Sequence, residues 1–121
     1  MFQLDLKSGV PICDQIVNGF IKLKVLGVLK DDEQLPSVRA LASRFSVNPN
    51  TIQKAYAILE QRGIIYSVKG KGSFISGDTK AHSAVIDEAK EQFEKAVESA
   101  VALGLTYDDL KKIIDQKGGK P

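Results

Sequence analysis

The stretch from Leu35 to Ile75 constrains the fold of this chain most strongly, because its pattern predicts a helix, a turn, a second helix and a hairpin in direct succession. Pro36 and Ser37 open the first helix, since proline presets φ near a helix start and a serine hydroxyl can cap free N–H groups. One face of this helix is apolar at helical spacing, with Val38, Leu41, Ala42 and Phe45. The pattern ends near Val47, so this helix is short.

The second helix follows after a very short connection. Asn48 is a favourable N-cap, and Pro49 suits the first helical position because its missing N–H would have no partner there. The apolar stripe of this helix consists of Ile52, Ala55, Tyr56 and Leu59. Away from that stripe, the first turns carry the polar side chains of Asn50, Thr51, Gln53 and Lys54. Such side chains hydrogen-bond to phosphates and base edges, and the start of the second helix is the part of a helix-turn-helix that enters the DNA major groove.

A small basic hairpin is predicted after the second helix. Gly63 is a candidate left-handed cap, and residues 64–68 and 73–75 are rich in strand-forming side chains. They are joined by Lys69-Gly70-Lys71-Gly72, in which glycine permits close approach of the backbone and lysine supplies charge for phosphates. Helix, turn, helix and cationic hairpin together predict a winged helix-turn-helix, so double-stranded DNA is the expected partner.

The distribution of charge agrees with this prediction, although the net charge of +2 is small. Residues 1–77 contain ten basic residues against six acidic ones, a net charge of +4, whereas residues 78–121 contain seven against nine, a net charge of −2. Between Leu35 and Ile75, six basic residues stand against one acid, Glu60. Positive charge is therefore concentrated in the segment predicted to face DNA.

These residues resemble the GntR family of bacterial transcription regulators, and the resemblance extends over roughly residues 2–77. The motifs that carry it are Leu35-Pro36-Ser37-x-Arg39-x-Leu41-Ala42, Val47-Asn48-Pro49-Asn50-Thr51-Ile52-Gln53-Lys54-Ala55-Tyr56, Leu59-Glu60, Gly63-Ile64-Ile65 and Lys69-Gly70-Lys71-Gly72-Ser73-Phe74. Val10-Pro11-Ile12 and Gln15-Ile16 also resemble the family's first helix. The family typically has an aromatic residue where Cys13 stands, a departure that affects no functional position.

The resemblance implies which side chains contact DNA. Carried over by position, they are Arg39 in the first motif helix, Asn48, Asn50, Thr51 and Gln53 at the start of the recognition helix, and Lys69, Gly70 and Lys71 at the wing tip. The wing glycine is expected to approach the minor groove. Lys54 lies on the same turns of the recognition helix and is a candidate phosphate contact; for Lys54, Arg44 and Arg62 the alternative is a solvated charge. Asn48 has the alternative role of a helix cap alone.

The N-terminal residues are predicted to complete this domain. Phe2, Leu4 and Leu6 alternate with polar residues, which indicates a short strand. Pro11 begins a helix that runs to about Leu26. The apolar face of this helix, which would pack across the two motif helices, consists of Ile12, Ile16, Phe20 and Leu23.

Two further amphipathic helices are predicted after Asp78. The first runs from about Ala81 to Leu103, and the second is capped by Thr106 and frays from Gln116 onward. Their apolar stripes are formed by Ile86, Ala89, Phe93, Val97 and Ala100 in the first helix and by Leu110, Ile113 and Ile114 in the second.

About 40 residues in two helices cannot bury two apolar stripes by themselves. Residues 78–121 are therefore predicted to form a two-helix dimerisation segment, and residues 1–77 the DNA-binding domain. The short YtrA-like branch of the GntR family similarly has two helices in place of a large effector domain. An alternative is that these helices dock a heterologous partner, which a monomer in solution would favour.

The expected fold class is α+β, mainly α, and the expected function is a homodimeric transcription regulator, in particular a repressor at a palindromic operator. No apolar run approaches the roughly 20 residues that span a bilayer, and no signal peptide is evident. The single cysteine, Cys13, cannot form an internal disulfide, which fits a reducing cytoplasm. One histidine, one cysteine and no Gly-rich nucleotide loop argue against an enzyme, and His82 lacks the partners of a metal site. No cofactor or metal is expected, and operator and effector are not specified.

Overall fold

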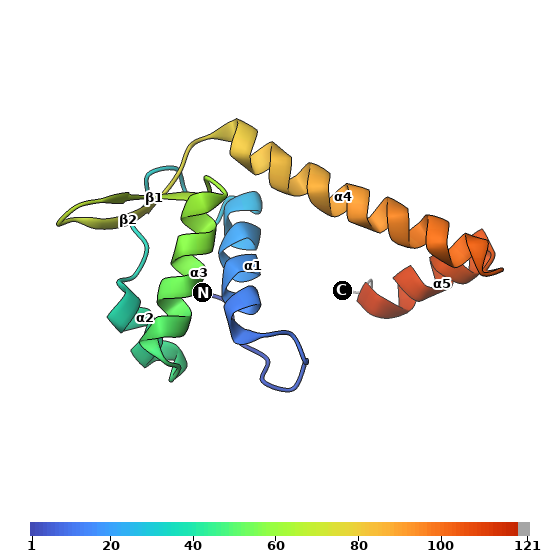
Figure 1. Cartoon of the computed structure of the whole chain (residues 1–121), viewed down its shortest axis with the longest axis horizontal. Helices are drawn as coiled ribbons and strands as arrows, with labels where there is room; N and C mark the ends of the chain where they lie inside the picture. The colour runs from blue at the N-terminus through green and yellow to red at the C-terminus, as the bar shows by residue number, and fades with distance from the viewer. Residues whose placement is uncertain (119–121) are drawn as a thin grey trace. The chain divides into compact units, whose positions relative to one another are not determined.

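The computed structural model describes residues 1–118 and contains five helices and one hairpin in that range (Figure 1). In chain order these are α1 (Ile12–Val25), α2 (Val38–Phe45), α3 (Pro49–Gln61), β1 (Ile65–Val68), β2 (Gly72–Ile75), α4 (Thr79–Ala102) and α5 (Tyr107–Gly118). The fold is mainly helical with one small sheet, as expected. The chain separates into two compact units, the first spanning Met1–Ser83 and the second beginning at Ala84.

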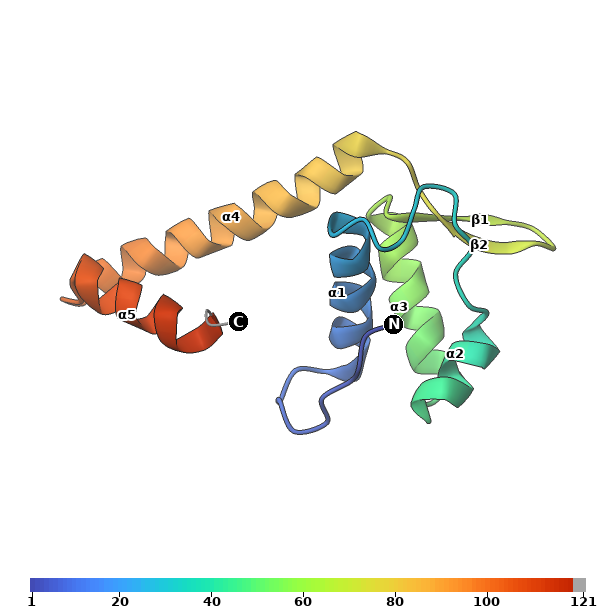
Figure 2. The ribbon, with the colours of Figure 1, turned by 180° about the vertical axis from the view of Figure 1, so that it is seen from behind.

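The first unit has a single apolar core between three helices and the base of the hairpin. Helices α1 and α3 lie side by side, and α2 packs against α3 (Figures 1 and 2). The fully buried large side chains are Ile16, Phe20, Leu41, Ile52, Leu59, Ile64 and Ile75. Tyr56 is also buried, its hydroxyl donates to the Pro36 carbonyl at 2.7 Å, and burial raises its pKa well above the usual range. The predicted apolar faces of the three helices therefore meet in this core.

The helix boundaries in the first unit have local causes. The Ser37 hydroxyl accepts from the Ala40 N–H at 3.1 Å, and the Asn48 amide oxygen accepts from the Asn50 N–H at 2.8 Å. After α3, Gly63 adopts φ +76° and the Ile64 N–H donates to the Leu59 carbonyl at 2.9 Å, the bond of a Schellman cap. The predicted caps are thus confirmed.

The predicted strand at Phe2, Leu4 and Leu6 is wrong. Within residues 1–118 no other segment pairs with this stretch. Instead the Gln15 side chain bonds both the N–H and the carbonyl of Asp5, each at 2.7 Å. The Phe2 ring packs against Phe20 and Phe45, with centroids 5.2 and 5.4 Å away. Phe2 therefore packs against the core of the first unit, whereas Leu6 is 78% exposed. Alternation alone does not form a strand without a partner strand.

The hairpin of β1 and β2 is antiparallel, with Ile65 opposite Ile75 and Val68 opposite Gly72. In both views it extends away from the three helices of the first unit (Figures 1 and 2). It is the predicted wing, starting one residue later in β1 and one residue earlier in β2 than the sequence pattern indicated. This hairpin therefore carries its connecting turn away from the core.

The second unit contains most of α4 and all of α5, and neither helix has a buried residue. A reciprocal cap starts α5: the Asp109 N–H donates to the Thr106 hydroxyl at 3.1 Å, and the Thr106 N–H donates to the Asp109 carboxylate at 2.9 Å. Hydrogen bonding of the Asp109 carboxylate to the Thr106 N–H, and secondly to the Thr106 hydroxyl, lowers the pKa of Asp109. Helix α5 continues to Gly118, so fraying from Gln116 is wrong for residues 116–118, and the rest of that predicted tail lies outside the described residues.

Candidate nucleic-acid interface

The start of α3 presents a polar surface to solvent. Asn50, Gln53 and Lys54 are exposed, and Thr51 is half-buried. Together with Ala57 they line a shallow hollow of about 420 Å³. The opposite face of the helix is anchored in the core, so this surface is held rigidly on the domain. Such an arrangement can present amide, hydroxyl and ammonium groups to base edges and phosphates.

Ala57 was not among the sequence-predicted contacts. It lies seven residues after Asn50 and four after Gln53, which is the spacing of one helix face. This spacing could have placed Ala57 on the exposed surface, but alanine has no polar group that would suggest a contact with DNA. Asn48, by contrast, uses its side-chain oxygen as the cap of α3.

The wing tip is a tight, exposed turn. The Lys71 N–H donates to the Val68 carbonyl at 2.9 Å, and Gly70 adopts φ +78°, which glycine reaches without steric cost. Lys69, Gly70 and Lys71 are all exposed. Both ammonium groups are therefore carried on a projecting loop, where phosphates could reach them.

The structure brings the wing tip close to the start of α2. A hollow of about 410 Å³ is lined by residues 34–38, by residues 67–73 and by Tyr56. Arg39 is exposed in the first turn of α2, directly after the residues that line this hollow. The predicted contacts of the first motif helix and of the wing thus lie beside one groove, which the sequence could not indicate.

The basic residues of this surface are not neutralised within the described part of the chain. Among residues 1–118, ion pairs within 4.0 Å join only Lys24 to Asp31, at 3.3 Å, and Lys95 to Glu91, at 3.4 Å. Neither pair includes a predicted DNA contact. The positive charge of Arg39, Lys54, Lys69 and Lys71 therefore remains available to an external anion.

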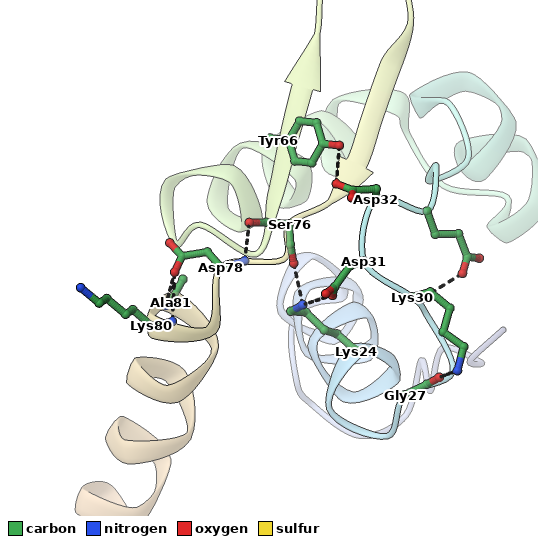
Figure 3. A network of polar contacts seen from close by, with 11 residues as sticks. Lys24, Gly27, Lys30, Asp31, Asp32, Tyr66, Ser76, Asp78, Lys80 and Ala81 are labelled. Atoms are coloured by element: carbon green, nitrogen blue, oxygen red, sulfur yellow. Dashed lines mark hydrogen bonds and ion pairs between the residues drawn. The ribbon is translucent and has the colours of Figure 1, made fainter.

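Sequence reasoning missed a polar network that ties this domain together (Figure 3). Lys24 is 9% exposed, and its ammonium donates to the Ser76 carbonyl at 2.6 Å and to Asp31 at 3.3 Å. The network thus joins α1 to the connection that follows β2, as Figure 3 shows. A signal existed, because Lys24 follows Ile16 and Phe20 at intervals of four on the buried face of α1.

A second part of the network lies at the base of the wing. The Tyr66 hydroxyl donates to the Asp32 carboxylate at 2.7 Å (Figure 3), which raises the pKa of Tyr66. The Tyr66 ring stacks on Phe74 with centroids 5.6 Å apart. Nearby, the Asp78 carboxylate caps α4 through the N–H groups of Lys80 and Ala81. The Tyr66 contacts hold the base of the wing and the Asp78 contacts begin α4. The periodicity of the sequence predicts neither set of contacts.

Other kinds of site find little support in the described residues. Burial raises the pKa of the Cys13 thiol, which disfavours the reactive thiolate. Within residues 1–118, no three His, Cys, Asp or Glu side chains gather as a metal site would require. None of the helices there is long and apolar enough to cross a bilayer.

The winged helix-turn-helix, with its exposed polar recognition helix and cationic wing, places this chain in the class of winged-helix DNA-binding proteins. Residues 24–75 match the profile described as "Bacterial regulatory proteins, gntR family". The chain is also 37% identical to the HTH-type transcriptional repressor YtrA of Bacillus subtilis, over 99% of this chain and 98% of that protein. The chain belongs to the GntR family, with YtrA-like length, and is a DNA-binding transcription regulator and not an enzyme.

Solved structures agree with this assignment. A GntR family transcriptional regulator from Listeria monocytogenes superposes with a TM-score of 0.75 at 32% identity, over 93% of this chain and all of that one. The DNA-binding domain of AraR, solved in complex with operator ORE1, matches 63% of this chain and 95% of that domain with a TM-score of 0.54 at 31% identity. The likeness to the Listeria regulator extends over both units, and the AraR likeness supports DNA binding by this fold.

Proposed function

We propose that this chain is a cytoplasmic, homodimeric repressor that binds an inverted repeat in operator DNA and thereby blocks access to a promoter. The observation that carries the proposal is the contrast between its two units. One unit has a full core and an exposed, unneutralised polar surface, and the other exposes its apolar stripes. The similarity to the repressor named YtrA, which extends over nearly the whole length of that protein, supports repression of transcription as the proposed activity.

In this proposal residues 1–77 bind DNA. The recognition helix reads base edges through its exposed polar side chains, and Arg39 adds a contact from α2. The wing lysines bind phosphates, Lys54 adds charge beside the reading surface, and Gly70 lets the wing backbone approach the minor groove. The proposed DNA contacts are Arg39, Asn48, Asn50, Thr51, Gln53, Lys54, Lys69, Gly70 and Lys71. Asn48 serves mainly by capping α3 and so orienting the residues that follow it.

Residues 78–121 form the proposed dimer seam. The stripe residues of α4 and α5 are exposed or half-buried within one chain, and Phe93 is 55% exposed. A large aromatic side chain in that position gains substantially from burial against a partner. The proposed seam residues are Ile86, Ala89, Phe93, Val97, Ala100, Leu110, Ile113 and Ile114. A twofold dimer would present two recognition helices to major-groove faces about 34–36 Å apart, which an inverted repeat requires.

Selection of bound fragments from a genomic DNA library, together with the mass of the free protein in solution, tests the proposal. We expect enrichment of a site with twofold symmetry and a mass of two chains. A monomer with no selected site would overturn the proposal and favour a heterologous partner for the C-terminal helices. A dimer that selects a single asymmetric site would contradict the palindromic operator while leaving dimerisation intact.

A further inference from the structure

The segment that precedes α2 runs alongside the wing and is bonded to it. The Asp32 N–H donates to the Ile75 carbonyl at 2.8 Å, and the Ile75 N–H donates to the Glu33 carbonyl at 2.9 Å. The Leu35 N–H donates to the Ser73 carbonyl at 2.8 Å. Residues 32–35 therefore form an irregular third row beside β2, and Gln34 lies within that row.

The Gln34 side chain extends this contact to the wing tip. Its amide nitrogen donates to the Lys71 carbonyl at 2.8 Å. Directly after Lys71, β2 passes so close that a Cβ on Gly72 would lie 2.9 Å from the same nitrogen, and Gly72 adopts φ +121°. Glycine is favoured here by its backbone conformation, which L side chains rarely adopt, and its lack of a Cβ leaves room for the Gln34 amide.

The wing tip has few other constraints. Residues 68–72 are all exposed, so none of their side chains is anchored in the core. Among residues 1–118, no other side chain from outside the hairpin hydrogen-bonds to residues 68–72. The Gln34 contact is thus the link between the tip and the segment that leads into α2.

We propose that Gln34 is a positioning residue for DNA binding. By holding the Lys71 carbonyl, it sets the wing tip at a defined distance from the start of α2 across the groove that both line. Lys69 and Lys71 can then bind phosphates while residues at the start of α2 contact the same duplex. This inference rests on the proposed contact between the wing and DNA. Gln34 is neutral, so its removal takes no charge from the protein.

Because Gln34 is neutral, its loss can change the salt dependence of DNA affinity only by moving the charged wing residues. The salt dependence therefore distinguishes a positioning role from a direct, neutral contact with DNA. Gln34→Met keeps the length of the side chain and removes the donor. We expect the full chain to bind a mixed-sequence duplex about fivefold more weakly at low salt, with a salt slope smaller by about one phosphate contact. Gln61→Met, an exposed substitution of the same kind at the end of α3, is the matched control and should change neither quantity.

Three outcomes would overturn the inference or its basis. An unchanged slope and affinity in Gln34→Met, with a smaller slope in Lys71→Ala, would refute positioning by Gln34 and leave the wing contact standing. Weaker binding with an unchanged slope would instead make Gln34 a direct, neutral DNA contact. If Lys71→Ala itself leaves the slope unchanged, the proposed wing contact fails.

A second variant guards against loss of folding in the first. Gln34→Asn keeps a neutral amide but is one methylene shorter, so its amide no longer reaches the Lys71 carbonyl. It should reproduce the smaller salt slope while the circular dichroism of the helices is unchanged. A folded Gln34→Asn protein with the wild-type slope would count against the inference.

Discussion

The two units of this protein are both helical, yet they differ in where their apolar side chains lie. In the first unit, the stripes of α1, α2 and α3 meet one another, and thirteen hydrophobic residues are buried. In α4 and α5, stripes of the same periodicity remain without a single buried residue. Periodicity therefore identifies an apolar face in both units, but only the number of packed elements decides whether the chain can cover it.

Truncation of one phenylalanine in each unit should have different consequences. Phe20→Ala removes a fully buried ring and should lower the free energy of unfolding by about 3–5 kcal/mol. Phe93→Ala should leave the unfolding of the first unit unchanged and show an effect that depends on protein concentration. Denaturant titrations at two protein concentrations measure both. A concentration-independent loss in Phe93→Ala would mean that Phe93 packs within its own chain.

A charge in the proposed seam should dissociate the dimer. Phe93→Asp buries a carboxylate at the centre of the stripe and should weaken association by at least about 2 kcal/mol. Gln92→Asp makes the same change in charge one residue earlier, off the stripe, and should leave the dimer intact. Sedimentation equilibrium of both variants gives the answer, and a Phe93→Asp protein that remains dimeric would remove α4 from the seam.

Loss of Arg39 should affect sequence recognition. If its guanidinium contacts a base, Arg39→Ala should cost about 1–3 kcal/mol of binding free energy and relax the preference at one position in each half-site. Repeating the DNA selection with this variant measures both changes. Wild-type affinity and preference would exclude Arg39 from the interface, despite its exposure beside the groove.

Loss of Lys71 should weaken binding to all DNA sequences by a similar factor. A phosphate contact carries no sequence information, so Lys71→Ala should lower affinity uniformly and reduce the salt slope by about 0.9. Titrations of a selected site and a mixed-sequence duplex at several salt concentrations test this. A loss confined to the selected site would assign Lys71 to base recognition instead.

The smallest expected effect concerns pH and the cap of α5. The pKa of Asp109 is lowered in the folded state, because the carboxylate accepts from the Thr106 N–H. Its contribution is therefore fully present above the ordinary pKa of an aspartate and is lost as pH falls through the lowered folded value. Hydrogen exchange at the Thr106 N–H should accelerate relative to the rest of α5 over that acidic window. The same transition in Asp109→Asn would show that another group causes it.

The features predicted correctly are those that depend on residues close together in the chain. The capping of α2 by Ser37 and of α3 by Asn48, and the turn at Gly63, each involve neighbours within five positions. Such contacts form wherever the local sequence permits them. The strand predicted at the N-terminus was wrong because a strand needs a partner strand, and a local pattern does not show whether one is present.

The helices, the wing and the family can be predicted from the sequence, because periodicity, caps and motifs depend on residues that are close together in the chain. The contacts that tie the first unit together depend instead on its tertiary packing. Lys24 bonds to Ser76 across 52 positions and Gln34 to Lys71 across 37, and both contacts exist because the core brings distant backbone segments within hydrogen-bond reach. A buried or confined polar group bonds to whichever partner the packing places beside it, and a local sequence pattern does not specify that partner.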